Sequence, residues 1–145
     1  MRDTQRKKVY TWENHTLCIY DYPTIEMRSV KTLVKKISKR YGIITPDVGH
    51  GQGARRAFYD HSHKVVFPRW ARSVPVVCHE MAHAIVNGVY FKGSAGHGRE
   101  FVRVYIDLLH WAKVAEDAAL VRTARDYGLD FCAPGNVTPR ALKKR

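Results

Sequence analysis

Cysteine is scarce in this sequence of 145 residues, and its spacing excludes two kinds of small protein. The three cysteines, Cys18, Cys78 and Cys132, are odd in number and lie far apart in the chain. They can build neither a disulfide framework nor a zinc ribbon of the CxxC type, because both need closely spaced or even-numbered cysteines. We therefore expect reduced cysteines and a cytoplasmic protein.

Long hydrophobic runs are also missing. The stretch 1–8 (MRDTQRKK) is charged, and no apolar segment typical of a secretory leader follows it. No part of the sequence approaches the roughly 20 apolar residues that a membrane-spanning helix needs. We therefore expect neither secretion nor a membrane location.

Acidic residues are few in comparison with basic ones. The chain has 13 Asp and Glu against 25 Lys and Arg, which gives a formal net charge of +12 at pH 7. An excess of this kind favours nucleic acid or another polyanion as a partner, and it carries no information about the fold.

The length of the chain suits one domain. A chain of 145 residues can bury roughly two-thirds of its unfolded surface around a single core. The sequence contains no internal repeat and no low-complexity linker. We expect a single domain over residues 1–145, with short basic tails at about 1–8 and 139–145.

The most informative segment is the HExxH motif at residues 79–83. Residues at i and i+4 are neighbours on a helix, so His79 and His83 can offer ring nitrogens to one tetrahedral zinc ion. Glu80 would lie beside the ion and could take a proton from zinc-coordinated water. Because HExxH occurs by chance in roughly one or two of a hundred such sequences, its surroundings must support the prediction.

The surroundings of the motif predict a buried helix from Val74 to Val89. Ser73 is suited to the N-cap, Pro75 is tolerated in the first turn, and Asn87-Gly88 predicts the end of the helix. The alternative is a core helix whose histidines are satisfied by hydrogen bonds alone. We favour the metal site, because two imidazoles and a carboxylate are costly to bury without a shared partner.

A third protein ligand is required, and the segment after the helix offers two candidates. His97 follows His83 after thirteen residues, enough to end the helix, turn and begin a second helix against it. Glu100 lies one turn after His97 on the same face and competes for this role. We favour His97 as the zinc ligand because of its ligand type, with Glu100 as a hydrogen-bond partner behind it.

The remaining sequence predicts a mixture of helices and short strands. Strands are expected at 15–20, 43–47, 54–60 and 64–67, and the last two form a hairpin. Helices are expected at 25–41, after His97 and at 115–127. Three further histidines lie in polar turns; they are His50, His61 and His63. We expect them to be exposed rather than to form a second metal site.

The helix expected at 25–41 has two different faces. Its apolar residues repeat at helical spacing; they are Val30, Leu33, Val34, Ile37 and Tyr41. Four basic residues gather on the opposite side; they are Arg28, Lys31, Lys35 and Lys39. Such a stripe is either a solvated surface or a contact for nucleic acid, and it is the candidate DNA-binding surface.

The segments HEMAHA (79–84) and GHGREF (96–101) together resemble the HExxHA and GHGxEF signatures of the SprT-like zinc metalloproteases, the Spartan family. The likeness extends over about 24–111 and includes the strand pair at 54–67. It implies that His79, His83 and His97 bind zinc and that Glu80 is the catalytic acid-base residue. It also implies a zincin-like α+β fold, and we expect a small, mostly antiparallel sheet packed on helices, the HExxH helix among them.

The resemblance also suggests the kind of substrate. Well-known members of the family cut proteins that are bound or crosslinked to DNA. Many of them carry a cysteine-rich zinc ribbon or a DNA-binding module after the protease domain, and the three cysteines here cannot build a ribbon. Basic residues near the C-terminus could contact phosphates in place of a ribbon.

Two functions follow as hypotheses. The first is a zinc endopeptidase with a protein substrate near DNA. The second is a noncatalytic nucleic-acid-binding protein in which zinc is structural, although an uncoordinated Glu80 has no use in such a site. The endopeptidase also needs a group that stabilises the oxyanion, and the sequence leaves this role open between Tyr90, Tyr105, Arg99 and an additional histidine.

Overall fold

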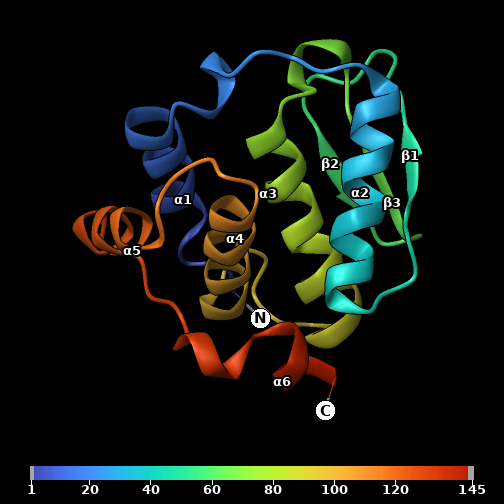
Figure 1. Ribbon diagram of the computed structural model, residues 1–145. Coiled ribbons are helices and arrows are strands. Elements are labelled where there is room, and N and C mark those ends of the chain that lie inside the picture. The colour runs from blue at the N-terminus through green and yellow to red at the C-terminus, as the bar shows by residue number, and fades with distance from the viewer. Residues whose placement is uncertain (1, 144–145) are drawn as a thin grey trace.

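The helix that carries the HExxH motif, α3 (Val74–Ile85), lies in the middle of the fold. In the computed structural model, which describes residues 2–143, α2 (Met27–Tyr41) and a small sheet lie on one side of α3. Helices α1 (Arg6–Trp12) and α4 (Arg99–Trp111) lie on the other side (Figure 1). Nearly all residues of α3 are buried, as its apolar sequence predicts.

The described residues form six α-helices and three strands, so the expected α+β class is confirmed. Helices α5 (Asp117–Asp126) and α6 (Pro139–Lys143) follow α4 and complete the set. Short helical turns connect the elements; they are Glu13–Leu17, Ile19–Asp21, Arg69–Ala71, Val86–Tyr90 and Pro134–Asn136. No helix of residues 2–143 has the length and apolar character to cross a membrane.

Helix α2 matches the helix expected at 25–41. Val30, Val34, Ile37 and Tyr41 are buried and form its inner face. The helix ends at Gly42, whose φ of 68° lies in the left-handed region that glycine adopts without strain. The Tyr41 hydroxyl donates a hydrogen bond to Asp107 Oδ2 on α4 (2.5 Å), which joins the two helices at the far end of the core.

The sheet is mixed, so the expectation of a mostly antiparallel sheet is wrong. β2 (Phe58–Asp60) and β3 (Lys64–Val66) form the expected antiparallel hairpin, with Tyr59 opposite Val65. β1 (Asp47–Gly49) pairs with the other edge of β3 in a parallel direction. The loop at 50–57 places β2 on the edge of β3 that lies away from β1. Because β2 and β3 are antiparallel and β1 runs opposite to β2, β1 lies parallel to β3. The strands are also shorter than predicted, and the strand predicted at 43–47 begins only at Asp47.

The N-terminal segment differs most from expectation. The basic tail predicted at about 1–8 is folded from residue 2, and α1 begins at Arg6. The strand predicted at 15–20 is replaced by helical turns, and Cys18 between them has a left-handed backbone with φ of 50°. The C-terminal tail predicted at 139–145 includes α6, and residues 144–145, like residue 1, lie outside the described residues.

The core lies where α2, α3 and α4 meet the sheet and the N-terminal helix. Its largest fully buried side chains include Trp12, Tyr41, Phe67, Met81, Phe101, Tyr105 and Ile106. Trp12 and Tyr105 contact each other edge to face, with ring centroids 5.9 Å apart. This contact fixes the N-terminal helical segment against α4, next to the motif helix.

Candidate metal centre

His79, His83 and His97 come together in the structure. His79 and His83 lie one turn apart on α3, and their ring centroids are 5.0 Å apart. The ring centroid of His97, just before α4, is 4.7 Å from that of His83 and 5.4 Å from that of His79. One nitrogen from each ring lies within 4.8 Å of the others, so the three residues could hold a metal ion.

Two glycines allow His97 to return to α3. Gly93 has a φ of 84° and lies in the turn after the helical turn Val86–Tyr90. Gly96 passes close to the N-terminal segment, and a Cβ atom at this position would lie 3.2 Å from Asp3 Oδ2. The absence of a side chain at Gly96 therefore lets the Asp3 carboxylate approach the neighbouring His97.

The Nδ1 atom of each of the three histidines has an oxygen partner. The pairs are His79 with Glu13 Oε2 (2.5 Å), His83 with Asn87 Oδ1 (2.8 Å) and His97 with Asp3 Oδ2 (2.7 Å). An oxygen acceptor at Nδ1 favours the tautomer that carries its proton there, and it leaves the lone pair of Nε2 for a metal. The three rings are therefore oriented as ligands.

Two further observations fit a metal ion at this place. His97 Nε2 is buried and has no hydrogen-bond partner among the described residues, a condition that costs roughly 1–3 kcal/mol unless another group satisfies it. Burial alone would lower the pKa of His79, but the carboxylates of Glu13 and Glu80 raise this pKa to about 9. The same negative charges favour a metal cation at Nε2. Three neutral imidazoles are a ligand set that suits zinc.

Glu80 lies beside the three histidines without being one of the converging ligands. Its Oε2 atom is 4.0 Å from His79 Nε2, and the residue is buried next to the open cleft. Burial raises the pKa of Glu80 to about 7, helped by the charge of Glu13 and opposed by His79 and Arg56. A carboxyl group with a pKa near neutrality can both accept and release a proton at physiological pH.

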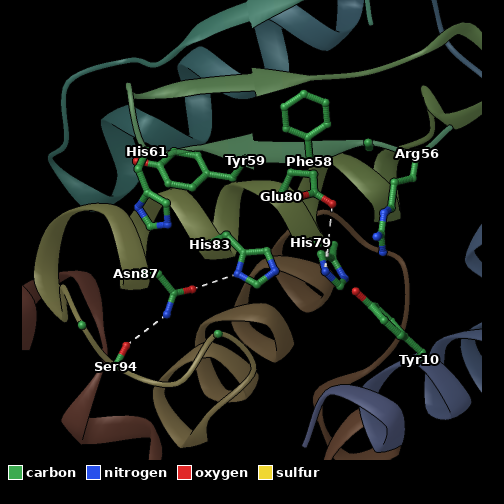
Figure 2. A pocket seen from close by; sticks show the side chains of 13 residues that line it. Tyr10, Arg56, Phe58, Tyr59, His61, His79, Glu80, His83, Asn87 and Ser94 are labelled. Carbon is green, nitrogen blue, oxygen red and sulfur yellow. Dashed lines mark hydrogen bonds and ion pairs between the residues drawn. The ribbon is translucent and has the colours of Figure 1, made fainter. Parts of the chain in front are cut away.

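His79, His83 and Glu80 line a cleft of about 720 Å³. Figure 2 shows His61 and Asn87 toward one end of this cleft and Tyr10 and Arg56 toward the other. Strand β2 runs along one wall, above Glu80. The cleft is open to solvent.

The apolar wall behind the site is supplied by α4. The Phe101 ring is stacked on the His83 ring, with centroids 4.4 Å apart and an interplanar angle of 27°. The Tyr105 hydroxyl donates a hydrogen bond to Glu13 Oε2 (2.6 Å), the same oxygen that contacts His79. The Glu13 carboxylate is therefore held in place from two sides.

The sequence prediction for Glu100 is wrong in one respect. Glu100 is half-buried on α4 and is not part of the converging group among the described residues. The carboxylate behind His97 belongs to Asp3 instead. Asp3 Oδ2 therefore occupies the position at His97 Nδ1 that the sequence assigned to Glu100.

The basic residues predicted to contact nucleic acid lie apart from the residues that line this cleft. Arg28, Lys31, Lys35 and Lys39 are all exposed on α2. The first three of them line a shallow groove together with Thr32 and His50. None of the four lines the cleft at the metal centre.

The oxygen partners of the three histidines are not among the site residues predicted from the sequence. Asn87 follows His83 by four residues, a spacing that places it on the same helix face, but it was interpreted only as the end of the helix. Asp3 and Glu13 carry no such signal, because 94 and 66 positions separate them from the histidines that they contact. Tyr10 is likewise absent from the site predicted from the sequence; it directly follows the basic stretch 1–8 that was expected to be a tail, and it lies on α1.

Comparison with known proteins gave no match: no protein-family model, no curated protein and no solved structure matches this chain. The functional interpretation therefore depends on the geometry of the site and on the sequence motifs.

Proposed function

We propose that this protein is a zinc-dependent endopeptidase of the SprT-like kind with a zincin-like fold. The observation that carries the proposal is the convergence of His79, His83 and His97, each with its Nδ1 atom bonded to an oxygen and its Nε2 atom left for a metal. Glu80 stands beside them in an open cleft, where a general base is needed.

In the proposed hydrolysis, the three histidines, Glu80 and the oxygen partners of the histidines have separate roles. His79, His83 and His97 would hold a zinc ion through their Nε2 atoms, and the ion would supply Lewis acidity for the attacking water and the peptide carbonyl. Glu80 takes a proton from the attacking water and gives it to the leaving amide nitrogen, so that the carboxylate is restored at the end of the reaction. Glu13, Asn87 and Asp3 keep the imidazoles in one orientation throughout.

The substrate that we propose is a protein bound or crosslinked to DNA. Two features support this choice: the net charge of +12 and the exposed row of basic side chains on α2. A polyanion attracted to this surface would raise the local concentration of proteins that are attached to it. The resemblance of HEMAHA and GHGREF to the SprT-like signatures favours the same substrate class.

The alternative is a noncatalytic nucleic-acid-binding protein with a structural zinc ion. Structural zinc sites are closed by four protein ligands. Among residues 2–143, the converging group contains three ligands, and Glu80 faces an open cleft beside it. These features favour the enzyme.

The proposal is tested by measuring zinc content and casein cleavage on the same preparations, with and without single-stranded DNA. We expect about one zinc per chain and cleavage by the wild type. Glu80→Gln should keep its zinc and lose cleavage, because a neutral amide cannot accept the proton. Glu100→Gln is the matched control, since it makes the same chemical change on α4 outside the converging group.

Three results would contradict the proposal. If wild-type protein contains no stoichiometric zinc, the proposed metal centre is wrong. Loss of zinc from Glu80→Gln would make Glu80 a ligand rather than a base. Equal cleavage by wild type and Glu80→Gln would assign the activity to a contaminant.

A further inference from the structure

Tyr90, Tyr105 and Arg99, the three side chains named from the sequence for oxyanion stabilisation, are occupied elsewhere. The additional histidine that lines the cleft is His61, which contacts the Tyr59 ring at the end of the cleft remote from Tyr10 (Figure 2). The Tyr105 hydroxyl is buried and donates to Glu13 Oε2, and the Tyr90 hydroxyl donates to the backbone oxygen of Tyr41 (2.7 Å). Arg99 is exposed and pairs with Asp130 (Nε to Oδ2, 3.0 Å). Tyr90, Tyr105 and Arg99 do not line the cleft at the metal centre. The role therefore needs another donor.

Tyr10 lies where such a donor is needed. Its ring is stacked near that of His79, with centroids 6.2 Å apart, and meets the His97 ring edge to face at 5.3 Å. Figure 2 shows its hydroxyl directed toward His79 from the side of the cleft opposite β2. Tyr10 also lines both the main cleft and a smaller adjoining cavity that reaches Glu80.

The Tyr10 hydroxyl has no hydrogen-bond partner among residues 2–143. Its ring contacts the two histidine rings, and the Arg6 guanidinium lies 5.6 Å from the centre of the Tyr10 ring. Tyrosine hydroxyls that have only a structural role usually have a partner, as those of Tyr90 and Tyr105 do. The donor of Tyr10 is thus free to bind a group that enters the cleft.

The backbone around Tyr10 is fixed on both sides. Before it, the Gln5 side chain donates to the backbone oxygens of His97 and Asp130, both at 3.0 Å. After it, Trp12 Nε1 donates to Thr123 Oγ1 (3.0 Å) and Glu13 is bonded to His79. A donor held by such contacts is preorganised, so that little free energy is lost in orienting it during the reaction.

We propose that Tyr10 is a catalytic residue that donates a hydrogen bond to the scissile carbonyl oxygen as negative charge develops on it. This inference rests on the proposed endopeptidase function. The water oxygen bonds to the carbonyl carbon, the C–N bond breaks, and the proton that Glu80 accepts goes to the leaving nitrogen. Tyr10 keeps its own proton and stabilises the tetrahedral state through the hydrogen bond alone.

The first test compares single tyrosine-to-phenylalanine variants in casein cleavage. Tyr10→Phe should lower kcat by roughly 100-fold, the effect of removing one oxyanion donor, with KM and zinc content unchanged. Tyr22→Phe is the matched control, because its half-buried hydroxyl contacts Val114 away from the cleft. Tyr20 lines the smaller cavity beside Tyr10 and Glu80, so it is the competing donor. Unchanged kcat in Tyr10→Phe, or a loss of activity found instead in Tyr20→Phe, would overturn the assignment.

The second test does not depend on turnover. After a casein cleavage site has been mapped, a peptide spanning it is made with a phosphonamidate in place of the scissile amide, as a mimic of the tetrahedral state. Tyr10→Phe should bind this peptide about 100-fold more weakly than wild type, while the unmodified peptide binds Glu80→Gln and Tyr10→Phe/Glu80→Gln equally. Equally weakened binding of both peptides would make Tyr10 a general binding residue and contradict the proposal.

The two levels of the hypothesis can fail separately. If wild-type protein holds no zinc and cleaves nothing, both the proposed function and the role of Tyr10 are wrong. If wild type cleaves casein in a zinc- and Glu80-dependent manner and Tyr10→Phe does so equally well, only the role of Tyr10 is wrong.

Discussion

Glu13 Oε2 lies 2.5 Å from Nδ1 of His79, and this contact joins the N-terminal helical segment to the motif helix across 66 positions of sequence. Both side chains are buried, and the Tyr105 hydroxyl holds the same carboxylate oxygen. A carboxylate behind a metal-binding histidine fixes the ring and makes it a better electron donor. The affinity of the site for zinc should therefore depend on a residue outside the HExxH motif.

Replacement of the Glu13 carboxylate tests whether its contact with His79 supports zinc binding. We expect Glu13→Gln to lower zinc affinity by about tenfold and Glu13→Ala by more, within the roughly 10–100-fold range typical of residues behind metal ligands. Affinity is measured by competition with a chromophoric chelator. Glu26→Gln is the control, since the Glu26 carboxylate is exposed and pairs with Arg28 (3.7 Å) away from the histidines. Wild-type zinc affinity in Glu13→Ala would show that the contact does not support the site.

The pH dependence of zinc binding follows from the pKa of His79. The carboxylates of Glu13 and Glu80 raise this pKa to about 9, whereas burial lowers the pKa values of His83 and His97. At pH 7 the metal-free site therefore holds a proton on His79 that zinc must displace. Zinc affinity should rise by about tenfold per pH unit between about pH 6.5 and 8.5, with the gain ending as pH passes the His79 pKa.

Calorimetry in buffers of different ionisation enthalpy measures the protons released on zinc binding. We expect at least one proton per zinc at pH 7, because Glu80 also has a raised pKa and can release part of a second one. Affinity that is independent of pH across this range, with no proton release, would contradict the charge state assigned to His79.

Metal removal should lower thermal stability. A ligand present at about 1,000 times its Kd stabilises the folded state by about 4 kcal/mol. For a chain of this size that corresponds to a change in Tm on the order of 10 °C. A thermal melt with and without chelator measures the shift. Glu80→Gln should show the full shift and His83→Ala almost none, and equal shifts in these two variants would mean that the stabilising metal binds elsewhere.

The parts of the site that are local in the chain can be predicted from the sequence. His79, Glu80 and His83 follow from the spacing of one helical turn, and His97 follows from a return length that the glycines permit. The oxygen partners Asp3 and Glu13 are determined by tertiary contacts, for which a single sequence has no periodic signal. The basic composition of residues 1–8 favoured a solvated tail, but Gln5 and Val9 are buried and dock this segment beside the histidines.

The sheet illustrates the same limit. The hairpin of β2 and β3 is predictable because a short polar turn separates two β-prone segments. β1 pairs with the edge of β3 that the hairpin leaves free, and it runs parallel to β3. The apolar pattern of a three-residue strand predicts neither the edge that it joins nor its direction. The HTLCIY segment has β-prone side chains, yet it forms helical turns that contact α1 and α3.

The basic face of α2 provides the last prediction, which concerns DNA. Replacement of Arg28, Lys31, Lys35 and Lys39 by alanine should weaken binding to single-stranded DNA and flatten its salt dependence, because fewer counterions are then released. The slope of log K against log salt should become shallower by about 0.7 for each phosphate that the protein no longer neutralises. If each of the four basic residues neutralises one phosphate, the quadruple variant should change the slope by up to about 3. Fluorescence anisotropy between about 50 and 200 mM salt measures the slope, since affinity changes strongly over this range.

Four exposed basic residues on other parts of the chain serve as the matched control for net charge; they are Lys7, Lys64, Lys92 and Arg122. Equal effects of the two sets would mean that only net charge attracts DNA, and wild-type binding that is absent at low salt would remove α2 as a nucleic-acid surface while leaving the metal centre unaffected.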